Sequence, residues 1–197
     1  MRFDMWEWSR WKHPRTTQFL DHLISVDFAD RYDALCRAHP VRGEKVPVPL
    51  RTEAINNVGR PMYWSRPMRR YMWREGWRVP SSLPKYCAIG LDVRIEQRVE
   101  LELLFVTPDG HLSGPFHRYL KQIRQLTTPH YKHNNPAPRI RMPEELPAIL
   151  AESLALYDDI ANALRADTWW EWVPKPWLYD KSVRHLYEKK DETKEAA

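Results

Sequence analysis

The sequence predicts an α+β fold: a small antiparallel β element packed by amphipathic helices, with extended aromatic-rich arms at both termini. Apolar residues alternate with charged ones between residues 86 and 112, and they recur at helical spacing in residues 115–126 and 143–165. Of the ten tryptophans, seven lie in the first eleven residues and in residues 169–177. A chain of 197 residues can form one domain with its own core, so the aromatic ends are expected to be additions to it.

Residues 1–57 are predicted to form an N-terminal arm followed by short helices. Apolar residues recur at helical spacing from Phe19 to Ile24, after two threonines that can cap a helix. Asp27 can cap a second helix, which is expected to end before Pro40. From residue 41 to residue 60 the apolar residues show neither helical nor strand spacing, and the prolines there indicate an extended connection.

Residues 58–84 are interpreted as a basic aromatic connector. Between residues 60 and 78 this segment carries six arginines, five aromatic residues and one acid, Glu75. Prolines interrupt its first part, and we expect a helix from Met68 to Glu75.

Residues 85–167 are predicted to form the body of the fold. Apolar residues occupy every second position of this segment, at Leu91, Val93 and Ile95 and then from Val99 to Phe105. This alternation is typical of a strand with one buried face. The pattern fits either one long bent strand or two strands joined near residues 96–98. A turn at Asp109-Gly110 precedes a short return strand.

Two helices complete the predicted body. Pro115 opens a helix that runs to about residue 126, and Pro143 opens the longest amphipathic helix, which runs to residue 165. A polar loop without acidic residues, 127–142, joins them. We expect both helices to pack on the β element.

The tail, residues 168–197, is interpreted as a second arm, stiffened by Pro174 and Pro176. Tryptophan and arginine are the residue types that most often anchor protein interfaces. The partner-binding residues predicted from the sequence are therefore Trp6, Trp8, Trp11, Arg66, Arg69, Arg70, Trp73, Arg74, Trp77, Trp169, Trp170, Trp172 and Trp177.

The sequence contains no pattern that indicates catalysis. It lacks the glycine-rich phosphate-binding motifs and the nucleophile motifs, and its acidic pairs fall on expected helix surfaces. Cys36 and His39 have a ligand-like spacing, but Cys36 continues an apolar helix face and is interpreted as a buried thiol. We predict no catalytic, cofactor-binding or metal-binding residue.

Three partner chemistries fit the basic segment. Arginine and aromatic side chains bind acidic protein surfaces, stack on RNA bases and contact anionic lipid headgroups. The net charge is only +5, and residues 143–167 carry six acids and one arginine, which phosphate would repel. These charges favour protein subunits as the main partners.

The function expected from the sequence is that of a non-catalytic accessory subunit of a large multi-protein assembly. In general style, the aromatic- and arginine-rich, glycine-poor chain resembles accessory subunits of large organellar assemblies, such as respiratory complexes, ATP synthases or ribosomes. We expect a mitochondrial energy-transducing complex, either a respiratory complex or an ATP synthase. The alternative is an RNA-contacting protein of a mitochondrial ribosome. This resemblance leads us to expect a protein of the mitochondrion, or otherwise an intracellular soluble or membrane-peripheral one. No stretch is apolar for long enough to span a bilayer.

Overall fold

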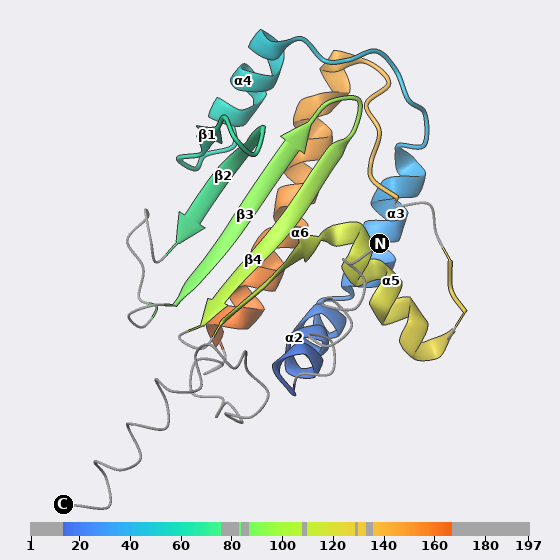
Figure 1. Ribbon diagram of the computed structural model, residues 1–197. Helices are drawn as coiled ribbons and strands as arrows, with labels where there is room; N and C mark the ends of the chain where they lie inside the picture. The colour runs from blue at the N-terminus through green and yellow to red at the C-terminus, as the bar shows by residue number, and fades with distance from the viewer. Residues whose placement is uncertain are drawn as a thin grey trace, which may run out of the picture.

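The computed structural model describes residues 14–75, 83, 87–107, 110–128, 130–132 and 136–166 (Figure 1). These residues form the predicted α+β body around an antiparallel sheet, with the strand order β1-β2-β3-β4-β5. The strands are β1 (Tyr63–Ser65), β2 (Arg70–Glu75), β3 (Ala88–Ile95), β4 (Val99–Thr107) and β5 (Gly110–Pro115). The helices are α2 (Pro14–Ser25), α3 (Phe28–Ala38), α4 (Val48–Asn56), α5 (Phe116–Thr127) and α6 (Leu146–Ala166), with a 3₁₀ turn at Pro143–Glu145. Residues 1–13 and 167–197, which include the predicted arms, lie outside the described residues.

The alternating segment forms two strands and not one. β3 and β4 pair in antiparallel register, with Ile95 opposite Val99, so the chain reverses over residues 96–98. Leu91 and Leu103 face each other in this register and are fully buried. The period of two places their apolar neighbours on the same inner face and the charged residues on the outer face.

The expected helix from Met68 to Glu75 is wrong, because this segment forms β2. Tyr71 and Trp73 lie opposite Val93 and Leu91 of β3 and are buried with them on the inner face. Aromatic side chains at alternate positions fit a pleated surface, and this packing outweighs the helix propensity of the segment. β1 and β2 thus extend the sheet into the residues that the sequence assigned to the connector.

Two other local expectations are corrected. α4 falls in the segment expected to be an extended connection, where Pro49 occupies the first turn of a helix that buries only Ala54 and Ile55. Asp27 precedes α3 as expected, but its φ of 54° is left-handed and its side chain makes no capping hydrogen bond. Its backbone N–H donates to the carbonyl of Ile24, which closes the turn between α2 and α3.

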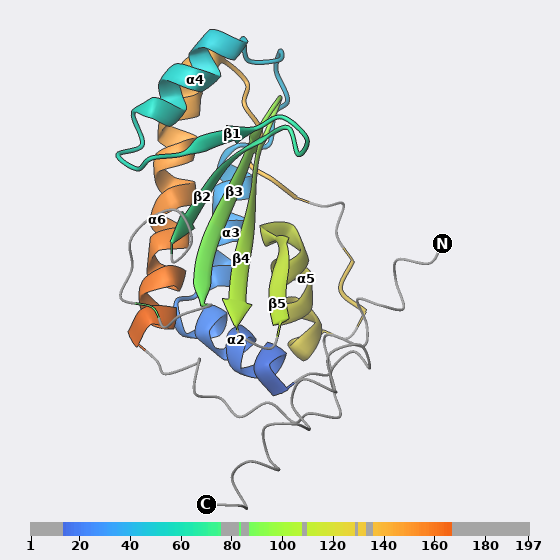
Figure 2. The same ribbon diagram turned by 60° about the vertical axis from the view of Figure 1, so that its left-hand side comes forward.

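The helices cover the inner face of the sheet. Figure 1 shows α6 behind β3 and β4, and Figure 2 shows α3 behind the strands, with α2 at the lower end and α5 beside β5. α6 buries ten residues, including Ile149, Tyr157 and Leu164, which confirms the amphipathic face predicted from its spacing. None of the helices in the described part of the chain combines the length and the apolar composition needed to cross a membrane.

Candidate functional site: a basic end of the body

The arginines of the basic segment divide into two groups. Arg60, Arg70 and Arg74 form ion pairs with carboxylates of the body. Arg66 and Arg69 lie in the turn between β1 and β2, are exposed, and have no ion pair with any described carboxylate. The fold therefore pairs three of the five described arginines of this segment with its own carboxylates, and it exposes Arg66 and Arg69.

Arg60 joins the sheet to α6. Its guanidinium donates to both carboxylate oxygens of Asp158, at 2.8 and 2.7 Å. It also lies 5.5 Å from the ring centroids of Trp73 and Tyr157, within the range of cation–π contacts. Burial is the main cause that raises the pKa of Tyr157. Trp73 is thus part of the inner face of the body, where only 8% of its surface is exposed.

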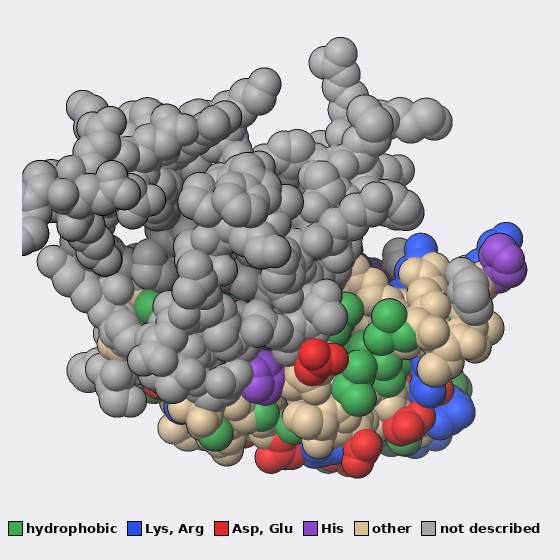
Figure 3. All heavy atoms as spheres, turned by 90° about the horizontal axis from the view of Figure 1, so that it is seen from below, with side chains coloured by type: hydrophobic (Ala, Val, Ile, Leu, Met, Phe, Trp, Pro, Cys, Tyr) green, Lys and Arg blue, Asp and Glu red, His purple; other side chains and the backbone are tan. Residues whose placement is uncertain are grey.

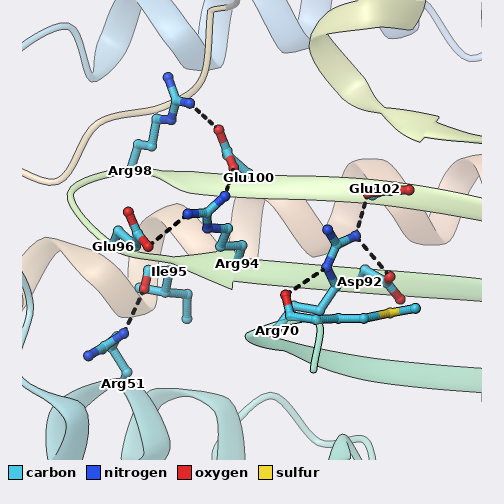
Figure 4. A network of polar contacts seen from close by, with 10 residues as sticks. Arg51, Arg70, Asp92, Arg94, Ile95, Glu96, Arg98, Glu100 and Glu102 are labelled. Atoms are coloured by element: carbon cyan, nitrogen blue, oxygen red, sulfur yellow. Dashed lines mark hydrogen bonds and ion pairs between the residues drawn. The ribbon is translucent and has the colours of Figure 1, made fainter. Parts of the chain in front are cut away.

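Arg70 belongs to a network of charges on the outer face of the sheet (Figure 4), and Arg74 joins this network through Asp92. Asp92 of β3 and Glu102 of β4 lie directly opposite each other, and the guanidinium of Arg70 bridges them. Arg74 pairs with the other oxygen of Asp92. Burial opposes the charged form of Arg70, but the attraction of Glu102 and Asp92 outweighs it and raises the pKa of the guanidinium. The network neutralises two neighbouring carboxylates inside the sheet.

The second part of the network lies where β3 turns into β4. Arg94 bonds Glu96 at 2.9 Å, and Arg98 pairs with Glu100 (Figure 4). The hydrogen bond from Arg94 is the main cause that lowers the pKa of Glu96, and the charges of Lys45 and Arg69 add to it. Lys45 and Arg69 therefore lie near this turn, although they come from different segments.

Four segments meet around the β3–β4 turn, and we call them together the basic end: residues 41–50, 64–69, 94–100 and 139–145. Arg42 Nε donates to Gln97 Oε1 at 2.7 Å, and the N–H of Gly43 donates to the carbonyl of Ile140 at 2.9 Å. The N–H of Val46 donates to the carbonyl of Glu96. In Figure 1 this is the upper end of the molecule, where α4 begins and the β3–β4 turn lies.

Positive charge at the basic end is in excess. Glu96, Glu100 and Glu145 each pair with an arginine of the same end. Of the described cations at this end, five form no ion pair with a described carboxylate: Arg42, Lys45, Arg66, Arg69 and Arg139. Glu44 and Glu144 are the acids of this end without a described cationic partner. The surface thus attracts anions.

Exposed apolar side chains gather at the same end. The described residues include eight large hydrophobic residues that are exposed, and six of them belong to the basic end: Val41, Val48, Leu50, Trp64, Met68 and Met142. The indole of Trp64 is 46% exposed and packs on Tyr71, with 4.9 Å between ring centroids. The hydroxyls of Tyr71 and Thr52 of α4 lie 3.3 Å apart, within hydrogen-bonding distance. The Trp64 indole therefore packs on a tyrosine ring that is itself held in place by α4.

Figure 3 shows the opposite end, where described acidic and basic side chains lie beside one another and a group of hydrophobic side chains is also exposed. The other two exposed large hydrophobic residues are Ile24 of α2 and Leu126 of α5. Arg124 pairs with Asp30 at 2.6 Å, and Arg31 pairs with Asp159 at 2.7 Å. The described cations of these helices are largely paired within the fold.

The structure thus brings together only part of the predicted partner-binding set. Arg66 and Arg69 are at the basic end, whereas Arg70, Trp73 and Arg74 lie in the sheet and contact other residues of the chain. Trp6, Trp8, Trp11, Trp77, Trp169, Trp170, Trp172 and Trp177 lie outside the described residues.

Sequence reasoning missed Arg42, Lys45 and Arg139, together with Val41 and Met142. They lie in two loops separated by about a hundred residues, and only the fold brings these loops together. A signal was present in the sequence, because Val41 and Met142 each stand next to an arginine.

Cys36 is half-buried, whereas the sequence indicated a buried thiol. It lies on α3 beside Tyr32, and burial, together with the charge of Asp33, raises its pKa to about 12 in spite of a hydrogen bond with Tyr32. Both Cys36 and Cys87 are free thiols. Among the described residues, no group of three or more His, Cys, Asp or Glu side chains could hold a metal ion.

We predict that Cys36 reacts slowly with alkylating reagents in the native protein. At pH 8 a thiol with a pKa of about 12 has a thiolate fraction on the order of a thousandfold lower than that of an unfolded cysteine. The measurement is pulsed alkylation with iodoacetamide, followed by peptide mapping, in buffer and in denaturant. Equal rates of Cys36 modification in the two conditions would contradict a half-buried, protonated thiol.

Comparison of the chain with protein-family models, with curated proteins and with solved structures gave no match.

Proposed function

We propose that the chain is a non-catalytic accessory subunit of a large multi-protein assembly, and that it attaches through the basic end and the aromatic arms. Mitochondrial energy-transducing complexes, which work in membranes, are the assemblies that its composition favours. In this proposal the arms contact neighbouring protein subunits of the assembly. The basic end contacts the membrane surface next to the assembly.

One observation carries the proposal: exposed apolar residues and unpaired cations gather at a single end of the described body. Monomeric proteins rarely gather exposed apolar residues in one place, and such surfaces commonly mark interaction sites. Trp64 and Met68 are 46% and 54% exposed, and they project from a hairpin whose strands belong to the main sheet. A rigid support reduces the entropy lost on binding, which suits a permanent contact.

The alternative function, an RNA-contacting ribosomal protein, has less support. Arg60, Arg70 and Arg74 are engaged by Asp158, Asp92 and Glu102 and are not available to phosphates. Most of the exposed apolar residues at the basic end are aliphatic, whereas single-stranded RNA is bound by stacking on aromatic rings.

The test is purification of the tagged full-length chain from its native source after mild detergent extraction, with mass spectrometry of the proteins that accompany it. We expect a fixed set of subunits in constant proportion, and sedimentation of the chain far above its monomer mass. A chain that elutes alone as a monomer, or with ribosomal RNA and ribosomal proteins, would overturn the proposal.

A further inference from the structure

We propose that the basic end docks on an anionic phospholipid surface, with its apolar side chains at the level of the acyl chains and its cations on the headgroup phosphates. This inference extends the proposed function, because it names the partner of the basic end.

The distribution of residues favours a lipid surface over a protein surface. Protein interfaces have a core depleted of charge and a polar rim. At the basic end the two kinds of residue are interspersed: Val41 is followed by Arg42, Met68 lies between Arg66 and Arg69, and Met142 follows Arg141. An interfacial membrane contact requires this mixture, because each apolar tip enters the bilayer boundary while the neighbouring cation stays at the phosphates.

The geometry offers several insertion points on one side of the body. The β1–β2 turn, the start of α4 and the loop before α6 come from separate parts of the chain. Met68, Val48 and Met142 are 54%, 60% and 47% exposed at these three points. Trp64, packed against Tyr71 beside the first of them, is an amphipathic ring of the type enriched at membrane interfaces.

The charge of the basic end complements an anionic surface. Arg66, Arg69 and Lys45 are exposed and form no ion pair with a described carboxylate. Among the described residues, the hydrogen bonds of the Arg42 and Arg139 side chains go to neutral oxygens of Gln97 and Pro40. Basic residues held near an anionic bilayer each contribute about 1 kcal/mol to binding. Neutralising two of them is therefore expected to weaken binding roughly 30-fold.

The experiment measures cosedimentation of the full-length chain with vesicles of 70% phosphatidylcholine and 30% phosphatidylglycerol, and with vesicles of phosphatidylcholine alone. We expect binding to the anionic vesicles that falls as salt is raised, and little binding to the neutral ones. The variant Arg66→Gln with Arg69→Gln should bind roughly 30-fold more weakly. The variant Val48→Ser with Met68→Ser should lose about tenfold, because it removes apolar contact and leaves the charge unchanged.

Matched variants at other places separate a specific surface from net charge. Lys121→Gln with Lys132→Gln removes the same charge from exposed positions outside the basic end, and Ile24→Ser with Leu126→Ser removes exposed apolar residues from α2 and α5. Both controls should bind within twofold of the unchanged chain. Circular dichroism and denaturation of every variant report whether the fold is kept.

Three results would overturn the lipid assignment: no binding of the unchanged chain to anionic vesicles, equal losses in the Arg66/Arg69 variant and the Lys121/Lys132 control, or unchanged binding of both basic-end variants. These failures differ from failure of the proposed function. A chain that copurifies with its assembly but does not bind vesicles keeps the accessory-subunit function and assigns the basic end to a protein neighbour.

Discussion

Replacing Asp92 by alanine is expected to destabilise the body by about 3–5 kcal/mol, because it leaves a buried guanidinium without its counter-charge. The side chains of Asp92 and Arg74 are 8% and 5% exposed. Without Asp92, the hydrogen-bond acceptors left to Arg74 among the described residues are the carbonyl oxygens of Trp73 and Leu91, at 2.9 and 3.1 Å. Arg70 also loses one of the two carboxylates that it bridges.

Urea unfolding of the purified variants measures this loss as a change in the free energy of unfolding. The double variant Asp92→Leu with Arg74→Met should lose less than Asp92→Ala, because it removes both buried charges. Glu96 pairs with Arg94 at the surface, where the Glu96 side chain is 41% exposed. Glu96→Ala should therefore lower the free energy of unfolding by less than about 1 kcal/mol. An Asp92→Ala protein within about 1 kcal/mol of the unchanged chain would show that the outer-face network does not stabilise the sheet.

Deletion of residues 168–197 is expected to release the chain from its assembly while the body stays folded. This arm contains Trp169, Trp170, Trp172 and Trp177, and buried tryptophan anchors commonly account for about 2–4 kcal/mol each when truncated. α6 ends at Ala166, before the deletion, and its buried face contacts the sheet and α3.

The measurement combines circular dichroism of the truncated chain with its sedimentation in native extract. Retained helicity together with loss of cosedimentation supports an arm that holds protein neighbours. Normal incorporation of the folded, truncated chain would show that the arm is dispensable, and loss of helicity would place these tryptophans in the core.

The sequence was sufficient to predict the parts of the fold that have strong periodicity. The alternation of Leu91, Val93 and Ile95 predicted β3, and the spacing of Ile149, Tyr157 and Leu164 predicted α6. α4 was missed because its nine residues bury only Ala54 and Ile55, which gives no measurable period. β2 was misread because arginines occupy its outer positions, and nothing local showed that Asp92 and Glu102 would neutralise them.

The candidate site was harder to predict, for a related reason. Arg66, Arg69 and Arg74 look alike in sequence, but only the pairing of β2 with β3 determines which guanidinium meets a carboxylate. The gathering of Arg42, Lys45 and Arg139 depends on contacts between distant loops, such as that of Gly43 with Ile140. Local composition identified a basic segment, and tertiary structure determined which of its charges remain exposed.

Photocrosslinking at Met68 tests most directly whether the basic end is the contact surface of this protein. A photoreactive phenylalanine analogue at position 68 in the full-length chain, irradiated in native membranes, should give an adduct with phospholipid, whereas the same analogue at exposed Leu126 should give none. An adduct of similar yield at both positions, an adduct with RNA at position 68, or the absence of any adduct there would contradict the account.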